Sequence, residues 1–207
     1  MPLQNRISPF SELFVTPARG TLMGNRGGRI HDARRKLGTR RWTSKQWICC
    51  VLDFKGRHRK VWGDSYTELF FLDEVTALAA GHRPCFECRR KAAESFALLF
   101  SGGKQRVRAG AMDAVLHRER LEGKAKRLHR LGIDSLPDGA MIALNGKVEG
   151  QAFAVLGKHL LRWTPQGYAG TQSRPHNIDV DALTPPSILK VLTNGYAPRW
   201  HPSAAGA

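Results

Sequence analysis

The sequence predicts an α+β fold in which a β-hairpin and helices are followed by a small antiparallel β unit. Three observations support this prediction. Two β-prone runs at residues 46–62 flank the turn-forming pair Lys55-Gly56, and helical patterns then continue to about residue 135. After that, short apolar runs alternate at hairpin spacing with turn signals at Asp138-Gly139, Asn145-Gly146 and Gly157.

Start and stop signals place the helices. Asp73 is a suitable N-cap for a helix that Gly81 closes, and a second helix is expected from near Cys85 to Phe100. Residues 104–136 form a basic helical stretch with Met112 and Leu116 on its apolar face. Residues 184–196 predict a short final helix with prolines in its first turn.

The chain of 207 residues is long enough to bury a core of its own. We expect three segments: a basic, loop-rich segment at 1–45, a helical domain at 46–135, and the β unit with its helix at 136–207, packed on that domain. Residues 24–41 are rich in glycine and are predicted to be mainly loop.

The chain is strongly basic. It has 33 Lys and Arg against 17 Asp and Glu, a formal net charge of +16, on a sequence that is 42% hydrophobic and therefore globular. Such an excess of positive charge favours a polyanionic partner, although a basic protein without one is the alternative.

The sequence has no signal peptide and no apolar run long enough to span a membrane. We therefore expect a cytoplasmic protein that does not enter a membrane. In a reducing compartment its four cysteines favour metal binding or burial over disulfides.

The stretch AGHRPCFECRR at residues 80–90 contains a Cys-x-x-Cys turn at Cys85 and Cys88. Such a turn brings two sulfurs within reach of one tetrahedral Zn²⁺, and a helix that starts there stabilises thiolates. A thioredoxin-like redox pair would need a preceding buried strand, and two buried structural thiols remain a third interpretation. We favour half of a zinc site.

Two further ligands are needed. Cys49 and Cys50 are adjacent in a predicted strand, so their side chains point to opposite faces and one ion normally takes one of them. His58 and His82 are the other candidates. The order of preference is Cys50, Cys49, His82 and His58, after Cys85 and Cys88.

The segment LFFLDEVTALAAGHRPCFECRR, about residues 69–90, resembles the metal-binding domain of Ada-type DNA alkylation-repair proteins. The matched positions are Ala80, Gly81, Arg83, Pro84, Cys85, Cys88 and Arg89. The resemblance implies that Cys85 and Cys88 bind zinc on a DNA-directed protein. In that family four cysteines bind zinc and one of an upstream pair accepts a methyl group from DNA. The family's spacing places that pair at Phe54 and His58, so no reactive cysteine carries over.

The layout of the whole chain also resembles a group of bacterial proteins of this length. This likeness implies that the chain is one working unit, and it implies no particular activity.

Basic side chains are the expected contacts to nucleic-acid phosphates, and DNA is expected more than RNA. They are Arg29, Arg34, Arg35, Lys36, Arg40, Arg41, Arg89 and Arg90, with Trp42 as a neighbouring stacking surface. An exposed loop without a partner is the alternative interpretation of the segment around Arg34.

The sequence thus predicts a zinc-containing nucleic-acid-binding protein. The alternative is an enzyme that acts on nucleic acid, a nuclease or a repair activity, with a reactive cysteine or the pair His31-Asp32 at its centre. The oligomeric state does not follow from the sequence.

Overall fold

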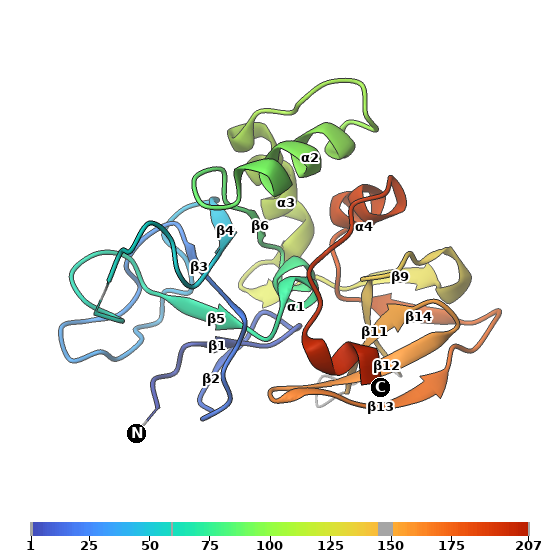
Figure 1. Ribbon diagram of the computed structural model, residues 1–207, viewed down its shortest axis with the longest axis horizontal. Coiled ribbons are helices and arrows are strands. Elements are labelled where there is room, and N and C mark those ends of the chain that lie inside the picture. The colour runs from blue at the N-terminus through green and yellow to red at the C-terminus, as the bar shows by residue number, and fades with distance from the viewer. Residues whose placement is uncertain (1, 59, 145–150, 207) are drawn as a thin grey trace.

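The computed structural model describes residues 2–58, 60–144 and 151–206, and it confirms a mixed α+β fold (Figure 1). Strands of the described residues form two six-stranded sheets and one two-stranded ribbon. Four α-helices accompany them in this part of the chain: α1 Glu74–Ala79, α2 Arg90–Phe100, α3 Ala109–Arg120 and α4 Pro186–Thr193. Every helix among these residues is too short or too polar to cross a lipid bilayer.

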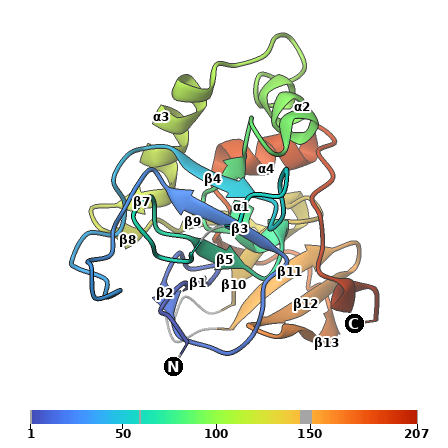
Figure 2. The ribbon, with the colours of Figure 1, turned by 60° about the vertical axis from the view of Figure 1, so that its left-hand side comes forward.

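The first sheet has the strand order β2-β1-β5-β3-β4-β6. Its strands are β1 Arg6–Ile7, β2 Leu13–Phe14, β3 Leu22–Arg26, β4 Trp47–Cys50, β5 Leu69–Phe71 and β6 Arg83–Pro84. β3 pairs antiparallel with both β4 and β5, whereas β6 lies parallel to β4. Figure 2 shows β3 and β4 side by side beneath α2 and α3.

The predicted hairpin at residues 46–62 is wrong, although its first strand and its turn are present. Lys55 and Gly56 both have positive φ, and the amide of Arg57 donates to the carbonyl of Phe54 at 3.1 Å. No strand follows that turn in the described residues up to β5. The physical reason is that both edges of β4 are already occupied, by β3 and β6.

The loop predicted at residues 24–41 is wrong at its start, because residues 24–26 belong to β3. Gly24 suits a close approach between strands here, because a Cβ at this position would lie 2.1 Å from the carbonyl oxygen of Ile48. Glycine therefore permits tight strand pairing instead of breaking the strand. The boundary expected at residue 45 lies between two strands that are hydrogen-bonded to each other.

The helix predictions hold in part. Asp73 caps α1, which Gly81 follows with a φ of +80°. α2 begins at Arg90, later than expected, because turns occupy the residues after Cys85. The predicted helix at 104–136 is confirmed only as α3, with Met112 and Leu116 buried. After α3 the chain forms β7 Leu121–Glu122, β8 Ala125–Lys126 and β9 His129–Gly132, because Gly123 with positive φ turns the chain back.

The second sheet is the predicted antiparallel β unit, enlarged by β9. Its order is β13-β12-β11-β10-β14-β9, and its remaining strands are β10 Met141–Ala143, β11 Ala152–Leu156, β12 His159–Thr164, β13 Gly167–Ser173 and β14 Asp179–Ala182. The turn predicted at Asn145-Gly146 lies outside the described residues. α4 follows with a proline in its first turn, as predicted.

Helix α1 lies between the two sheets (Figure 1). Val75 and Ala79 pack against Met141 and Leu161 of the second sheet. On the other side, Ala77 and Ala80 belong to a core cluster with residues of the first sheet, such as Leu22 and Phe71. The helix thereby joins the two halves of the molecule and fixes the loop from Gly81 to Arg89.

Candidate metal centre

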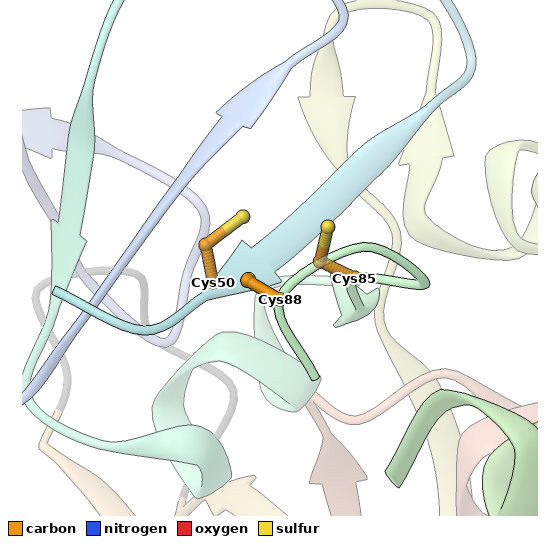
Figure 3. Close-up of side chains that lie close together, drawn as sticks. All are labelled: Cys50, Cys85 and Cys88. Carbon is orange, nitrogen blue, oxygen red and sulfur yellow. The ribbon is translucent and has the colours of Figure 1, made fainter. Parts of the chain in front are cut away.

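Three cysteines come together at one end of β4. The sulfurs of Cys50, Cys85 and Cys88 all lie within 4.8 Å of one another (Figure 3). Sulfur ligands of a tetrahedral Zn²⁺, each about 2.3 Å from the ion, are about 3.8 Å apart, so small side-chain movements would let all three bind one ion. The described residues thus contain a three-thiol group that could hold a metal.

Local structure explains how these residues meet. Cys50 ends β4, and the parallel pairing of β4 with β6 brings the residue after Pro84 beside it. The amide of Cys85 donates to the carbonyl of Cys49 at 3.0 Å, which fixes this register. The turn from Cys85 to Cys88 then brings the fourth residue back towards the same point, and the amide of Glu87 donates to the sulfur of Cys85 at 3.4 Å.

The proximity of the sulfurs changes their acidity. Hydrogen bonds from Cys50 and then from Cys88 lower the pKa of the Cys85 thiol to about 2. The same contact with Cys85, followed by that with Cys88, raises the pKa of Cys50 far above its usual value. Three thiolates at this spacing repel one another, so one ionised sulfur is held by protonated neighbours. A divalent cation removes that repulsion and favours ionisation of all three.

Cys49 does not belong to this cluster. It lies on the opposite face of β4, fully buried, where its sulfur accepts a hydrogen bond from Arg89 at 3.4 Å. Burial raises the pKa of the Cys49 thiol, so a nucleophilic thiolate is disfavoured there. The strand register thus decides between the two adjacent cysteines that the sequence offered.

The two candidate histidines also lie outside the cluster. His58 is exposed. His82 is fully buried between the rings of Trp47 and Phe71, at centroid distances of 5.1 and 4.7 Å. Burial holds the pKa of His82 well below its usual value, so the ring is neutral. Three cysteines alone are therefore brought together among the six predicted ligand candidates.

A cavity of about 290 Å³ opens beside the three sulfurs, on the same face of the first sheet. Most of its wall is apolar, from residues that include Met23, Ile48, Leu52, Phe54 and Phe70. Metals held by three protein ligands keep one position for water or substrate, whereas closed structural sites have four. Three cysteines next to a cavity match the open, three-ligand kind of site.

Glu68 is the cavity residue that the sequence did not single out for the metal centre. It is 2% exposed, and one carboxylate oxygen accepts a hydrogen bond from the amide of Trp62 at 2.8 Å. The other oxygen, Oε1, has no hydrogen-bond partner among the described residues. An unpartnered buried acceptor is costly, so it points to a ligand or water in the cavity. The strand parity that places Glu68 there needs the β3–β5 register, which no local signal reveals.

The predicted phosphate contacts fall into two groups. Arg29, Arg34, Arg35, Lys36 and Arg40 are exposed on the loop between β3 and β4, and Arg41 is half-buried. Arg90 is exposed and pairs with Glu94 at 3.1 Å. Arg89 is buried instead, and its guanidinium lies 2.6 Å from Glu74, whose carboxylate raises the pKa of Arg89 against the opposite effect of burial. This inward orientation leaves Arg89 unavailable to a phosphate.

The pair His31-Asp32 does not assemble as an acid–base pair. His31 stacks on Trp62, and its ring nitrogens contact the Thr67 hydroxyl at 2.6 Å and the Gly63 carbonyl at 3.0 Å. Asp32 instead accepts from two amides of its own turn. His31 therefore has a structural role in holding the loop.

Comparisons with protein-family models, with curated proteins and with solved structures found no match for this chain. The arguments about function thus depend on the residues themselves.

Proposed function

We propose that this chain is a zinc-binding protein that binds nucleic acid, DNA in preference to RNA, in the cytoplasm. The observation that supports it most is the group of three sulfurs within 4.8 Å of one another. Thiolates select soft or borderline ions, and zinc is the common one that suits such a site without redox chemistry. The likeness of residues 69–90 to the Ada-type domain favours the same ion at Cys85 and Cys88.

The nucleic-acid part of the proposal is supported by charge. The net charge is +16, and five cations between Arg29 and Arg40 are exposed on one loop. Each contact between such a side chain and a phosphate releases counterions, which drives binding at low salt. This loop joins Arg26 of β3 to Trp47 of β4, so it is attached at the end of β4 opposite to Cys50.

A salt series tests this part. Wild-type protein is expected to bind double-stranded DNA with an affinity that falls steeply as salt rises, with a slope of roughly −0.9 per phosphate contact. Replacing Arg34, Arg35 and Arg40 by glutamine should weaken binding and make the slope shallower by up to about 3 in log–log units. Single-stranded DNA and RNA measured in parallel rank the nucleic acids.

The matched control replaces Lys158, Arg162 and Lys190, three exposed cations elsewhere on the chain, by glutamine. This variant has the same net charge as the loop variant, so it should keep most of the wild-type slope. Binding that does not respond to salt, or equal losses in both variants, would contradict the proposed loop contacts.

The cavity favours a second candidate, an enzyme that acts on nucleic acid. Cys50, Cys85 and Cys88 would hold a metal beside the cavity, where it would supply Lewis-acid chemistry, and Glu68 places a buried carboxylate in the cavity wall. From the strand spacing, the Cα atoms of Cys50 and Glu68 are about 12 Å apart, which is too far for a fourth ligand and suits a group across the cavity. Glu68 could serve as general base or could orient a substrate amino group.

Substitution of Glu68 by glutamine tests this candidate. The change is nearly isosteric, and it should lower kcat on plain or damaged DNA by roughly 10²- to 10⁴-fold with the metal retained. Glu87→Gln is the control, because Glu87 also lines the cavity but is exposed and pairs with Arg57. Absence of turnover by the wild-type protein, or full activity of Glu68→Gln, would remove this candidate.

A further inference from the structure

The face of the first sheet that lies away from the metal centre holds a group of buried cations. Arg26 of β3 and Arg120 at the end of α3 are 2% and 0% exposed. Both guanidinium carbons lie over the ring of Trp47, at 4.0 and 3.9 Å from its centroid. Strand parity explains the separation of the two sites, because Arg26 pairs directly with Trp47 whereas Met23 pairs with Cys50.

These cations have no anionic partner. Among the described residues, no carboxylate lies within 4.0 Å of Arg26, of Arg120 or of Lys126 in β8. Backbone carbonyls accept from all three groups: Ser11 for Arg26, Gly81 for Arg120 and Ala79 for Lys126, whose side chain is half-buried. Burial lowers the pKa of both arginines to about 9 and that of Lys126 to about 7. The fold therefore buries the two guanidinium groups of Arg26 and Arg120 without a carboxylate within 4.0 Å.

Unused hydrogen-bond donors lie in the same place. The Nε atoms of Arg26 and Arg120 and the indole Nε1 of Trp47 are buried without a partner among the described residues. Buried charges are normally paired, and buried donors are normally bonded, because otherwise their desolvation is not repaid. Several such violations together are typical of a site that waits for a ligand.

A cavity of about 450 Å³ adjoins these groups. Among the described residues that line it, one is acidic, Glu12, and four are basic: Arg26, Arg41, Lys124 and Lys126. The indoles of Trp42 and Trp47 also face it, with their rings 6.1 Å apart. The cavity thus combines excess positive charge, free donors and aromatic surface.

We propose that this cavity binds a phosphate group, with Arg26 and Lys126 as its principal ligands and Trp42 beside the group that the phosphate carries. A guanidinium fork and an ammonium suit a phosphate dianion, and an indole suits a stacked base. The inference deepens the proposed nucleic-acid binding and rests on it for the source of the phosphate. Inorganic phosphate and a free nucleotide share this chemistry.

Thermal unfolding of the full chain tests the proposal. Phosphate at 10 mM, compared with chloride at equal ionic strength, should raise the Tm of the wild-type protein by roughly 3–6 °C for a dissociation constant near 1 mM. Arg26→Met and Lys126→Met should each lose most of that shift. Lys158→Met, at an exposed lysine in the turn between β11 and β12, should keep it.

Stability without phosphate distinguishes a ligand site from cations that only support the fold. If the cavity is a ligand site, each methionine variant should have a Tm in phosphate-free buffer close to or above the wild-type value, because a cation without a carboxylate partner has been removed. A variant that is destabilised without phosphate and still responds to it would overturn the proposal. Should Arg26→Met fail to fold, Lys126→Met and a phosphate titration of the wild-type protein followed by ³¹P NMR decide the question.

Three probes distinguish the possible sources of the phosphate: inorganic phosphate, thymidine 5′-monophosphate and a short single-stranded oligonucleotide. Tighter binding of the oligonucleotide, lost in both methionine variants, supports the cavity as part of the nucleic-acid site. Oligonucleotide binding that survives both variants overturns the cavity and leaves the proposed function standing. Binding of phosphate or the mononucleotide alone keeps the cavity and removes nucleic-acid binding. No response to any probe overturns both.

Discussion

Replacing Cys50, Cys85 or Cys88 singly by serine is expected to abolish stoichiometric zinc binding, whereas Cys49→Ser should retain one zinc per chain. Each of the three supplies one sulfur to the cluster, and serine is a poor zinc ligand at neutral pH because its hydroxyl stays protonated. Loss of an outer-shell partner alone weakens metal binding about 10- to 100-fold, so loss of a ligand should cost more. Metal analysis of the purified, dialysed proteins measures this.

Cys49→Ser is the matched control because Cys49 is the neighbour of Cys50 in β4 and differs from it in the face it occupies. All four variants replace cysteine by serine, so a difference in their zinc content depends on where each cysteine lies. A wild-type protein without metal, or a Cys49→Ser variant that loses metal as completely as Cys50→Ser, would contradict the assignment. Titration with Co²⁺, whose thiolate complexes absorb light, gives an independent count of the sulfur ligands.

Asp73→Ala is expected to lower the free energy of unfolding by about 3–5 kcal/mol. The carboxylate is fully buried and accepts four hydrogen bonds. Two come from the amide and hydroxyl of Thr76, both at 2.8 Å, and cap α1. The others come from the Tyr168 hydroxyl at 2.8 Å and the His201 amide at 3.0 Å, which lie in the second half of the molecule. Alanine leaves these donors buried without an acceptor.

Urea unfolding at neutral pH measures the loss, and thermal unfolding should show a Tm lower by roughly 10 °C or more. Tyr168→Phe removes one of the four bonds and should cost about 1–2 kcal/mol. Asp32→Ala is the control, since this carboxylate also accepts from two amides but at an exposed turn, so the loss of stability should be much smaller than at Asp73. A loss at Asp73 no larger than that at Asp32 would mean that Asp73 does not join the two halves.

Local signals predicted some helix ends correctly and missed others, such as the start of α2 and the end of α3. The Asp73 cap, the stop at Gly81 and the proline start of α4 depend on residues within one or two turns of each other, so the sequence alone contains them. The Cys85–Cys88 turn is local in the same sense. The hairpin predicted at residues 46–62 was wrong because it paired β4 with the next β-prone run along the chain. β4 pairs instead with β3, more than twenty residues earlier, and Gly24 permits the close approach of the two strands.

The positions of the charged residues were also predicted only in part. The sequence shows that arginine is abundant, but only the fold decides which arginines face solvent. Arg89 and Arg90 are adjacent, yet one is buried against Glu74 and the other is exposed beside Glu94. Arg26 and Arg120, which no sequence pattern singled out, are buried with backbone carbonyls and no carboxylate as partners, and Lys126 lies half-buried with the Ala79 carbonyl as its acceptor.

The sequence by itself determined the α+β class, the strongly basic character and the two-cysteine turn, because composition and short-range spacing specify these properties. The tertiary structure decided that Cys50 and not Cys49 joins that turn, that Glu68 faces the same cavity, and that Arg26 is buried beside another. The physical reason is strand parity: side chains alternate between the faces of a sheet, so a register set by distant partners decides which residues meet.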